Sequence, residues 1–305
     1  MRLASVHGRA QLVRKATESD ESIGGRFDLA PSSTITDIAN LSEQRFGPSL
    51  DAIYEQWDAF TSWLADLGEA GLAALPADGT WVPDLADPVV SRPSQVFAVG
   101  LNYRAHAAEA SAALPDVPLV FTKFPSSIAP AFGSVAAYTP QLDWEVEVTV
   151  VIGRGGLNIA RADAWSHVAG VTAAQDYSSR DTQFASKSNP QFSLGKSYPG
   201  YLPIGPVLVT PDEFPDVDAI GLSCAVNGET RQKSNTSDLI FSVSECIEYI
   251  SGICELRPGD LILTGTPEGV GMGLKPPLYL QPGDEVVTRV DLVGEMRQRV
   301  VAPTA

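Results

Sequence analysis

The chain has 305 residues, of which 44% are hydrophobic and 19% charged, enough apolar material for one large or two modest globular domains. Its 26 glycines and 23 prolines divide the apolar runs into short pieces, which excludes a coiled coil, collagen or disorder and favours strands. A net charge of −16 argues against nucleic acid and anionic membranes as partners. Because no apolar stretch suggests a membrane span or a signal peptide, we expect a cytoplasmic protein.

Residues 1–90 form a compositional unit that carries fourteen acidic and only six basic side chains. Strand-like pieces at 3–6 and 11–13 open it, and an acidic loop follows at 17–26. Apolar residues recur at three- and four-residue spacing in 49–68, which predicts one amphipathic helix with a serine cap at its start and a glycine at its end. We expect these ninety residues to form a small N-terminal α+β domain.

The second unit begins near Ser91, after a proline-rich strap. Most of it consists of short β runs, with helices predicted at 102–113, 161–169 and 239–252. Strands and helices do not alternate regularly as they would in a parallel α/β sheet. We therefore expect residues 91–305 to form a mostly β domain of the α+β class, with a mixed or largely antiparallel sheet.

The segment DWEVEV contains the first candidate site. Strand periodicity of two places Glu145 and Glu147 on one face and the intervening valines on the other. Adjacent carboxylates destabilise each other unless a cation lies between them, so the pair suits a hard divalent ion such as Mg²⁺, Mn²⁺ or Ca²⁺. A solvated strand face is the alternative, and the motif alone leaves it open.

A second candidate site follows thirty residues later, where an apolar run ends at Asp176. This carboxylate is placed to act as a third oxygen ligand. Arg180 and Gln183, a few residues on, are planar donors suited to hold a carboxylate or carbonyl. An Asx turn closed by an Arg–Asp pair would explain the same residues.

Two further segments carry groups suited to proton transfer or charge stabilisation. His106 and Glu109 are three residues apart on a predicted helix that Asn102 can cap, so the carboxylate can orient the imidazole and leave its other nitrogen basic towards a water. Lys196 lies in a turn-rich segment, from which a long cationic side chain can reach into a cleft. A surface His–Glu pair and a solvated lysine are the alternatives.

Several common site types are excluded. The glycine-rich stretch TGTPEGVGMGLKPP is not followed by a helix, and VIGRGGL lacks the third glycine of a dinucleotide fingerprint. There is no GxSxG elbow and no HExxH helix. The three cysteines cannot all pair within one chain and none lies in a CxxC spacing, so we expect a reducing compartment and unreactive core thiols.

Taken in this order, the segments resemble the C-terminal domain of the fumarylacetoacetate hydrolase family. The matching motifs are GLNYRAHAAE at 100, DWEVEVTVVIGR at 143, AGVTAAQDYSSRDTQ at 169, LGKSYPGYLPIGP at 194, VNGE at 226 and LRPGDLILTGTPEGVG at 256. The resemblance covers roughly residues 91–300, whereas residues 1–90 look like the variable N-terminal region of the family. It implies a mixed β-sandwich or roll with a metal at its mouth, and a homodimer.

The resemblance also assigns roles to residues of this chain. It implies that the metal is held by Glu145, Glu147 and Asp176. It implies that His106 and Glu109 form a water-activating dyad on a segment that orders over the substrate. The residues that it places along the site are Lys123, Arg180, Gln183, Lys196 and Thr266, the last taking a substrate carboxylate together with backbone amides. Pro199 departs from the family, because many members have an acidic residue there, and this departure concerns the substrate head group.

From the residues and the resemblance together we expect a Mg²⁺- or Mn²⁺-dependent hydrolase, with Ca²⁺ also compatible. It would cleave a carbon–carbon bond in a small anionic 1,3-dicarbonyl acid of the acylpyruvate or fumarylpyruvate type, with His106, Glu109 and Lys196 as catalytic residues. A decarboxylase, isomerase or hydratase of 2-oxo acids would use the same metal and enolate. A non-catalytic protein that holds a structural Ca²⁺ and binds a small acid is a third alternative.

Overall fold

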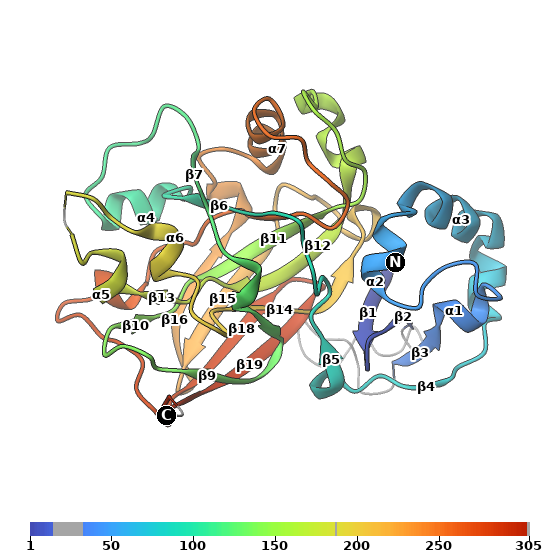
Figure 1. Ribbon diagram of the computed structural model, residues 1–305, viewed down its shortest axis with the longest axis horizontal. Coiled ribbons are helices and arrows are strands. Elements are labelled where there is room, and N and C mark those ends of the chain that lie inside the picture. The colour runs from blue at the N-terminus through green and yellow to red at the C-terminus, as the bar shows by residue number, and fades with distance from the viewer. Residues whose placement is uncertain (15–32, 187, 304–305) are drawn as a thin grey trace.

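The computed structural model describes residues 1–14, 33–186 and 188–303, so the acidic loop predicted at 17–26 lies outside the described residues. It consists mostly of strands in mixed sheets, with a few short helices (Figure 1). This confirms the predicted α+β, mostly β class and the mixed sandwich or roll. The division at residue 90 stays a prediction.

The larger sheet joins the two predicted units. In pairing order its main path within the described residues is β4 (Gly79–Thr80), β3 (Thr34–Asp37), β2 (Arg9–Arg14), β1 (Arg2–Val6), β14 (Leu202–Val209), β12 (Val168–Gln175), β11 (Val146–Ile152), β17 (Leu261–Leu263), β6 (Val96–Gly100) and β7 (Leu119–Thr122). The short strands β5 (Ala86–Asp87) and β8 (Ile128–Pro130) pair with β1 and β14. Arg2 of β1 lies opposite Val209 of β14, so the N-terminal strands extend the sheet of the second unit.

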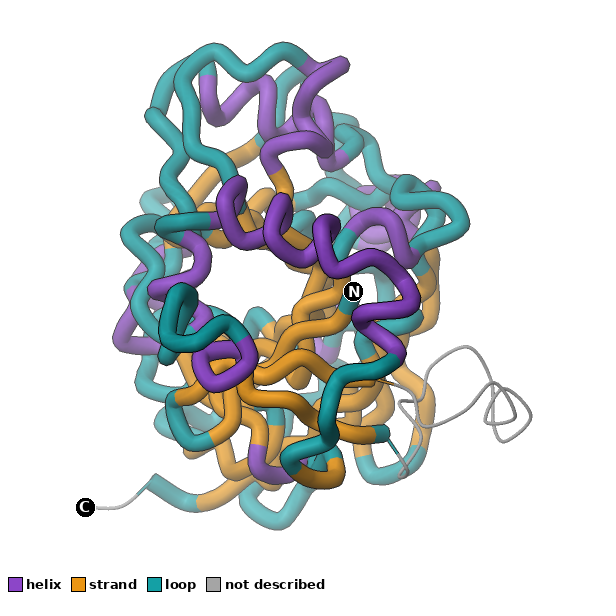
Figure 2. The backbone as a smooth tube through the Cα atoms, turned by 90° about the vertical axis from the view of Figure 1, so that its right-hand side faces the viewer, coloured by secondary structure: helices purple, strands orange, loops and turns teal. Residues whose placement is uncertain are grey.

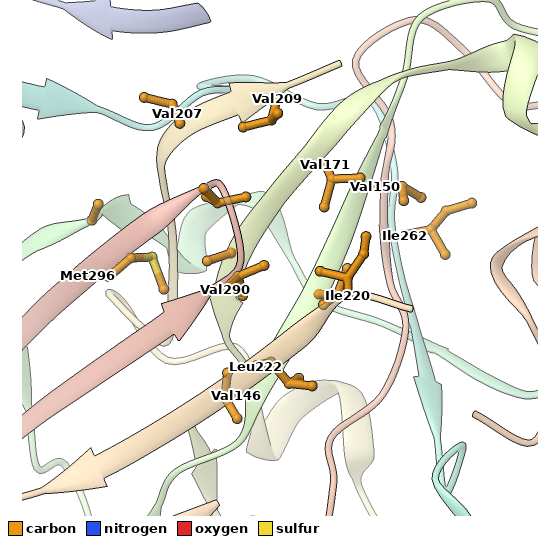
Figure 3. Packing of buried hydrophobic residues seen from close by; sticks show 14 of the residues in the cluster. Val146, Val150, Val171, Val207, Val209, Ile220, Leu222, Ile262, Val290 and Met296 are labelled. Carbon is orange, nitrogen blue, oxygen red and sulfur yellow. The ribbon is translucent and has the colours of Figure 1, made fainter. Parts of the chain in front are cut away.

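The smaller sheet packs on the first through apolar side chains. Its strands, in order, are β16 (Glu229–Asn235), β15 (Gly221–Val226), β18 (Glu285–Val290), β19 (Gly294–Val301) and β9 (Phe132–Ala136), and a separate pair joins β10 (Leu142–Asp143) to β13 (Ser178–Ser179). Figure 3 shows Val146 of β11 beside Leu222 of β15, with Val290 of β18 and Val171 of β12 in the same buried cluster. This packing is the core that fixes β11 and β12 in place.

Apart from the 17-residue α3, the helices are short, and all of them lie outside the sheets (Figure 2). They are α1 (Ile38–Leu41), α2 (Leu50–Tyr54), α3 (Trp57–Ala73), α4 (Arg104–Glu109), α5 (Arg180–Gln183), α6 (Phe192–Gly195) and α7 (Val243–Ser251). The 3₁₀ turns are η2 (Pro83–Leu85), η3 (Pro125–Ser127), η4 (Arg161–His167), η5 (Pro211–Glu213), η6 (Thr236–Asp238) and η7 (Gly271–Gly273). Among the described residues, no helix is long and apolar enough to cross a bilayer.

Two helix predictions need correction in the N-terminal half of the chain. The single helix expected over 49–68 is two helices, α2 and α3; Ser49 does cap the first by accepting from the Ala52 amide at 3.2 Å. Gly68 does not end the second helix but kinks it, with φ at +63°, and the chain resumes helical geometry up to Ala73. Aromatic contacts continue across the break between the two helices, from Tyr54 to Trp57 and on to Phe60, so the apolar spacing alone does not reveal the break.

The helix predicted at 102–113 is only α4, and Asn102 does not cap it. The Asn102 amide instead donates to the carbonyl of Thr264 at 2.8 Å and accepts from the amide of Phe241 at 2.9 Å, so it ties three segments together. The helix predicted at 161–169 is the 3₁₀ turn η4, and its last two residues belong to β12. The third, at 239–252, begins at Val243 behind a Ser242 capping box.

The cysteines are free thiols, as expected. Cys224 and Cys246 are buried, and burial raises the pKa of each to about 12. Such thiols stay protonated at neutral pH and are poor nucleophiles.

Candidate active site and metal centre

Three carboxylates meet where β11 begins and β12 ends. The two strands are antiparallel, with Glu147 opposite Ala174, so Glu147 in β11 and Glu145 just before it come close to Asp176 just after β12. One oxygen from each of the three lies within 4.8 Å of the other two, and the residues Glu145, Glu147 and Asp176 are 6, 2 and 0% exposed. A buried, all-oxygen donor set of this kind suits a hard divalent cation.

Lys196 and Arg180 compensate part of this negative charge. The Lys196 ammonium donates to Glu145 and to Asp176, both at 2.6 Å, and Arg180 donates to the other oxygen of Glu145 at 2.7 Å. Burial alone would raise the pKa of Glu145, but these two cations outweigh it and lower the pKa to about 2. Glu145 is therefore ionised at neutral pH, and Lys196 keeps a raised pKa because Asp176 and Glu145 overcome its own burial.

Glu147 is the least compensated of the three carboxylates. It accepts a hydrogen bond from the Gly265 amide at 2.7 Å. Burial, followed by the charges of Asp176 and Glu145, raises its pKa well above the usual value. A divalent cation beside Glu147 would supply the missing positive charge, so the residues present fit the metal that the sequence led us to expect.

Lys123 stands behind the triad. Its ammonium donates to Asp176 at 2.6 Å and to the carbonyl of Lys196, and its side chain is fully buried. Burial lowers its pKa, although Asp176 acts in the opposite direction. Lys123 does not line the cavity next to the triad, so its contacts are those of a residue that positions Asp176 and Lys196.

His106 and Glu109 of α4 form the expected pair. The imidazole Nδ1 lies 3.0 Å from a Glu109 oxygen, and the other Glu109 oxygen accepts from the Gly269 amide at 2.9 Å. Burial would raise the pKa of Glu109, but the hydrogen bonds from His106 and Gly269 lower it overall. The carboxylate is thus ionised and holds the imidazole in one orientation, with its second nitrogen free of this contact.

A cavity of about 250 Å³ is lined by Glu145 and Glu147 of the triad and by His106. Its polar floor contains Glu145, Glu147, Arg180, Gln183, Lys196 and Thr266. The cavity also has apolar lining, which includes an aromatic wall that we define as Phe121, Phe184 and Phe192. The ring centroids of Phe121 and Phe192 lie 5.7 Å apart, and Phe184 meets Phe192 edge-on at 6.3 Å. The cavity is therefore lined by both charged and apolar groups, and the two meet where the Lys196 ammonium lies 5.3 Å from the centroid of the Phe121 ring.

Seven of the ten predicted site residues line this cavity. They are His106, Glu145, Glu147, Arg180, Gln183, Lys196 and Thr266. Glu109, Lys123 and Asp176 lie behind it, and each makes a hydrogen bond within the same network. The roles assigned to these residues stay predictions.

Asp143 and Gln232 belong to the site and were not predicted. Asp143 accepts from Arg180 Nε at 2.9 Å and from the Gly271 amide at 2.7 Å, so it fixes Arg180 and the turn η7 together. Gln232 of β16 donates to the Thr266 hydroxyl at 2.8 Å and accepts from the Val146 amide at 3.0 Å. Asp143 begins the DWEVEV segment and was a detectable signal, whereas nothing in the sequence around Gln232 marks it.

Comparisons with known proteins agree with this geometry. Residues 95–301 match the model of the fumarylacetoacetate hydrolase C-terminal domain. The mitochondrial oxaloacetate tautomerase Fahd2a of Rattus norvegicus is 42% identical over 214 residues, which are 70% of this chain and 68% of that protein. A protein of Mycobacterium smegmatis whose crystal structure is known is 47% identical in sequence over the whole of both chains, and the two structures superpose with a TM-score of 0.86. The maleylpyruvate hydrolase of Sphingobium sp. SYK-6, in complex with manganese(II) and pyruvate, is 25% identical over the whole of both chains, with a TM-score of 0.74.

Proposed function

Because the chain belongs to the fumarylacetoacetate hydrolase family, we propose that it is a divalent-metal-dependent enzyme that interconverts the enol and keto forms of a small 2-oxo acid, with oxaloacetate as the first candidate. One observation carries the proposal: Glu145 and Glu147 of the buried carboxylate triad line the same cavity as His106, which a carboxylate orients. The rat relative supports tautomerisation, because it is named an oxaloacetate tautomerase and is 42% identical to this chain over 214 residues.

The residues of the cavity supply what such a reaction needs. A divalent ion held by the triad would polarise the 2-oxo group and stabilise negative charge on the enolate. Thr266 and Gln183 offer hydrogen-bond donors for the substrate carboxylate, and Lys196 lies beside Glu145 as a fixed cation. His106, oriented by Glu109, takes the enol proton and returns a proton to the substrate carbon, so the reaction consumes no net proton.

Hydrolysis of acylpyruvates is the second candidate, and the aromatic wall favours it. An acylpyruvate carries a hydrocarbon substituent that can pack against Phe121, Phe184 and Phe192. The distal carboxylate of oxaloacetate would gain nothing from these apolar rings. In this reaction His106 takes a proton from water as it attacks the distal carbonyl, and Lys196 and Gln183 stabilise the oxyanion. The carbon–carbon bond then breaks to give a carboxylic acid and the enolate of pyruvate.

The identity of the metal, the oligomeric state and the cellular location are also proposals. An all-oxygen donor set suits Mg²⁺ or Mn²⁺, and the Sphingobium structure contains manganese. The rat relative is mitochondrial by name, so the cytoplasmic location expected from the sequence stays a prediction, as does the homodimer.

The ultraviolet absorbance of the enol tests the proposal. Chelated protein is assayed with enolised oxaloacetate and with a series of acylpyruvates, before and after Mg²⁺ or Mn²⁺ is added, and pyruvate is measured in parallel. Metal-restored loss of the oxaloacetate enol without pyruvate supports the tautomerase. Loss of an acylpyruvate with one pyruvate per turnover supports the hydrolase instead. Formation of pyruvate from oxaloacetate would instead indicate a decarboxylase. No turnover of any substrate by the metal-bound protein would contradict both proposals.

A further inference from the structure

Gln232 connects the smaller sheet with the active site, although it does not itself line the cavity. It lies in β16 and is only 1% exposed. Its amide nitrogen donates to the Thr266 hydroxyl and to the Pro267 carbonyl, both at 2.8 Å. Its amide oxygen accepts at 3.0 Å from the backbone amide of Val146, the residue between the two glutamates of the triad. One side chain therefore contacts both a cavity residue and the strand that carries the carboxylates.

The orientation of the Gln232 amide follows from its partners. A carbonyl can only accept a hydrogen bond and a backbone amide can only donate one, so the nitrogen must face Pro267 and the oxygen must face Val146. The nitrogen then has one hydrogen for Pro267 and one for the Thr266 hydroxyl. Because Thr266 accepts this hydrogen through a lone pair, its own hydroxyl hydrogen points away from Gln232.

The hydroxyl hydrogen of Thr266 is left for the cavity. Thr266 lines the cavity, and among the described residues no group accepts a hydrogen bond from its hydroxyl. Gln183 is turned in the same sense, because its amide oxygen accepts from Arg180 at 2.8 Å, so its nitrogen faces elsewhere. Thr266 and Gln183 thus both offer hydrogens, which suits a group that only accepts, such as a carboxylate.

We propose that Gln232 is a positioning residue, which holds the Thr266 hydroxyl as a hydrogen-bond donor towards the carboxylate of a 2-oxo acid. Without the bond from Gln232 the hydroxyl hydrogen can rotate away from the substrate, so binding of the acid weakens. The inference rests on the proposed function, because it takes the substrate to be a 2-oxo acid, but it is the same for tautomerisation and for hydrolysis.

Gln175 of β12 offers a matched control. It is also fully buried, and its amide oxygen accepts from the backbone amide of Glu145 at 2.9 Å. Its nitrogen donates to the Thr288 hydroxyl at 2.9 Å, and Thr288 of β18 does not line the cavity. Both glutamines therefore join the two sheets, but only Gln232 reaches a hydroxyl of the cavity.

Titration of the Mn²⁺-loaded protein with oxalate tests the inference. Oxalate is an unreactive analogue of the pyruvate enolate, so its affinity can be measured whichever reaction the enzyme performs. We expect Thr266→Val to weaken oxalate binding about tenfold, as for the loss of one hydrogen bond to a charged group. Gln232→Met should weaken it about threefold or more but have no further effect in the Thr266→Val background, whereas Gln175→Met should have the same effect in both backgrounds.

Gln232→Glu is a second variant of nearly the same shape. It keeps an acceptor for the Val146 amide, but a carboxyl group supplies at most one hydrogen where the amide supplies two. Its effect on oxalate binding should depend on the Thr266 hydroxyl in the same way. Thermal unfolding of each chelated variant shows that the protein compared is folded.

The outcomes separate this inference from the proposed function. Equal oxalate affinities of the unmodified protein, Gln232→Met and Gln232→Glu would overturn the role of Gln232 and leave the proposed function intact. So would equal losses with and without the Thr266 hydroxyl, because Gln232 would then act on the fold alone. No oxalate binding by the unmodified Mn²⁺-loaded protein would contradict the proposed function and, with it, this inference.

Discussion

The floor and the wall of the active-site cavity are built by different forces. On the floor, the carboxylates of Glu145 and Asp176 are held by Lys196 at 2.6 Å each, so the geometry depends on charges that cannot move without a large cost. On the wall, Phe121 and Phe192 meet through ring contacts whose geometry is broad and whose energy is modest. The floor is therefore held mainly by charges and the wall mainly by ring contacts, and the two meet where the Lys196 ammonium lies over the Phe121 ring.

This difference separates chemistry from selectivity. The groups that move protons or bear charge lie on the floor and on α4, whereas the wall offers only apolar surface. Changes on the floor should lower the rate for every substrate. Changes on the wall should alter the ranking of substrates with little loss for some of them.

Glu147→Gln is the change with the largest expected effect. It removes one carboxylate of the triad and should lower metal-dependent activity roughly a thousandfold or more, because a catalytic metal supplies several kcal/mol of charge stabilisation. Since burial and then the charges of Asp176 and Glu145 raise the pKa of Glu147, a charged Glu147 is unfavourable without metal, and the chelated variant should be at least as stable as the unmodified protein. Thermal unfolding with and without Mn²⁺ measures both effects.

The surface variant Glu285→Gln is a suitable control, because it also removes one carboxylate from a strand but only disturbs an exposed pair with Arg297. A Glu147→Gln protein that kept its metal-induced thermal shift would contradict the assignment of the triad as the metal site.

His106→Gln should have the next largest effect. Loss of a general acid–base group costs on the order of 100- to 1,000-fold in kcat, while the metal-induced thermal shift should remain, because His106 contacts Glu109 rather than the triad. His167→Gln is the matched control, since His167 binds the Arg154 carbonyl outside the cavity. If His106→Gln kept full turnover on every substrate, the dyad would not take part in the reaction.

The sequence predicted the floor better than the wall, for a physical reason. Glu145 and Glu147 follow from the two-residue period of a strand, and Asp176 follows from the end of an apolar run, so each signal lies within a few residues. His106 and Glu109 follow from helical spacing in the same way. Local periodicity singled out these residues but left a solvated strand face and a surface His–Glu pair open, and the family resemblance favoured the site.

The wall depends on contacts between distant segments. Phe121 comes from β7, Phe192 from α6 and Phe184 from the end of α5, and no local pattern distinguishes them from core phenylalanines. Asn102 shows the same limit, because a residue typical of a helix cap instead bonds to Thr264 and Phe241. Local sequence together with the family resemblance therefore predicted the chemical groups, while long-range packing determined the shape of the cavity.

Gly265→Ala tests how tightly the backbone positions the floor. Gly265 has φ at +104°, and an added Cβ would lie 2.9 Å from the Asn102 Cβ, so the amide that binds Glu147 must shift. We expect metal affinity to fall about 10- to 100-fold, as for other changes that reorient a ligand. Gly283→Ala is the matched control, because its φ is +103° but a Cβ there meets no atom within 4 Å. Equal metal affinities of the two variants would refute this role.

Phe184→Arg should have the smallest effect on rate and the clearest effect on selectivity. Phe184 is 37% exposed at the mouth of the cavity, so its replacement disturbs little packing. An arginine there removes apolar contact and adds a partner for a distal carboxylate. The ratio of kcat/KM for an apolar acylpyruvate to that for oxaloacetate should therefore fall about tenfold, the low end of the range for one apolar contact.

Phe124→Arg is the control for this change, because Phe124 is 48% exposed but does not line the cavity, so the same substitution should leave the ratio unchanged. If Phe184→Arg and Phe124→Arg gave the same ratio as the unmodified enzyme, the substrate would not reach the wall, and the argument that favours acylpyruvates would fail. If the ratio falls while the metal-induced thermal shift stays constant, the wall selects the substrate independently of the floor, because the metal site has not been disturbed.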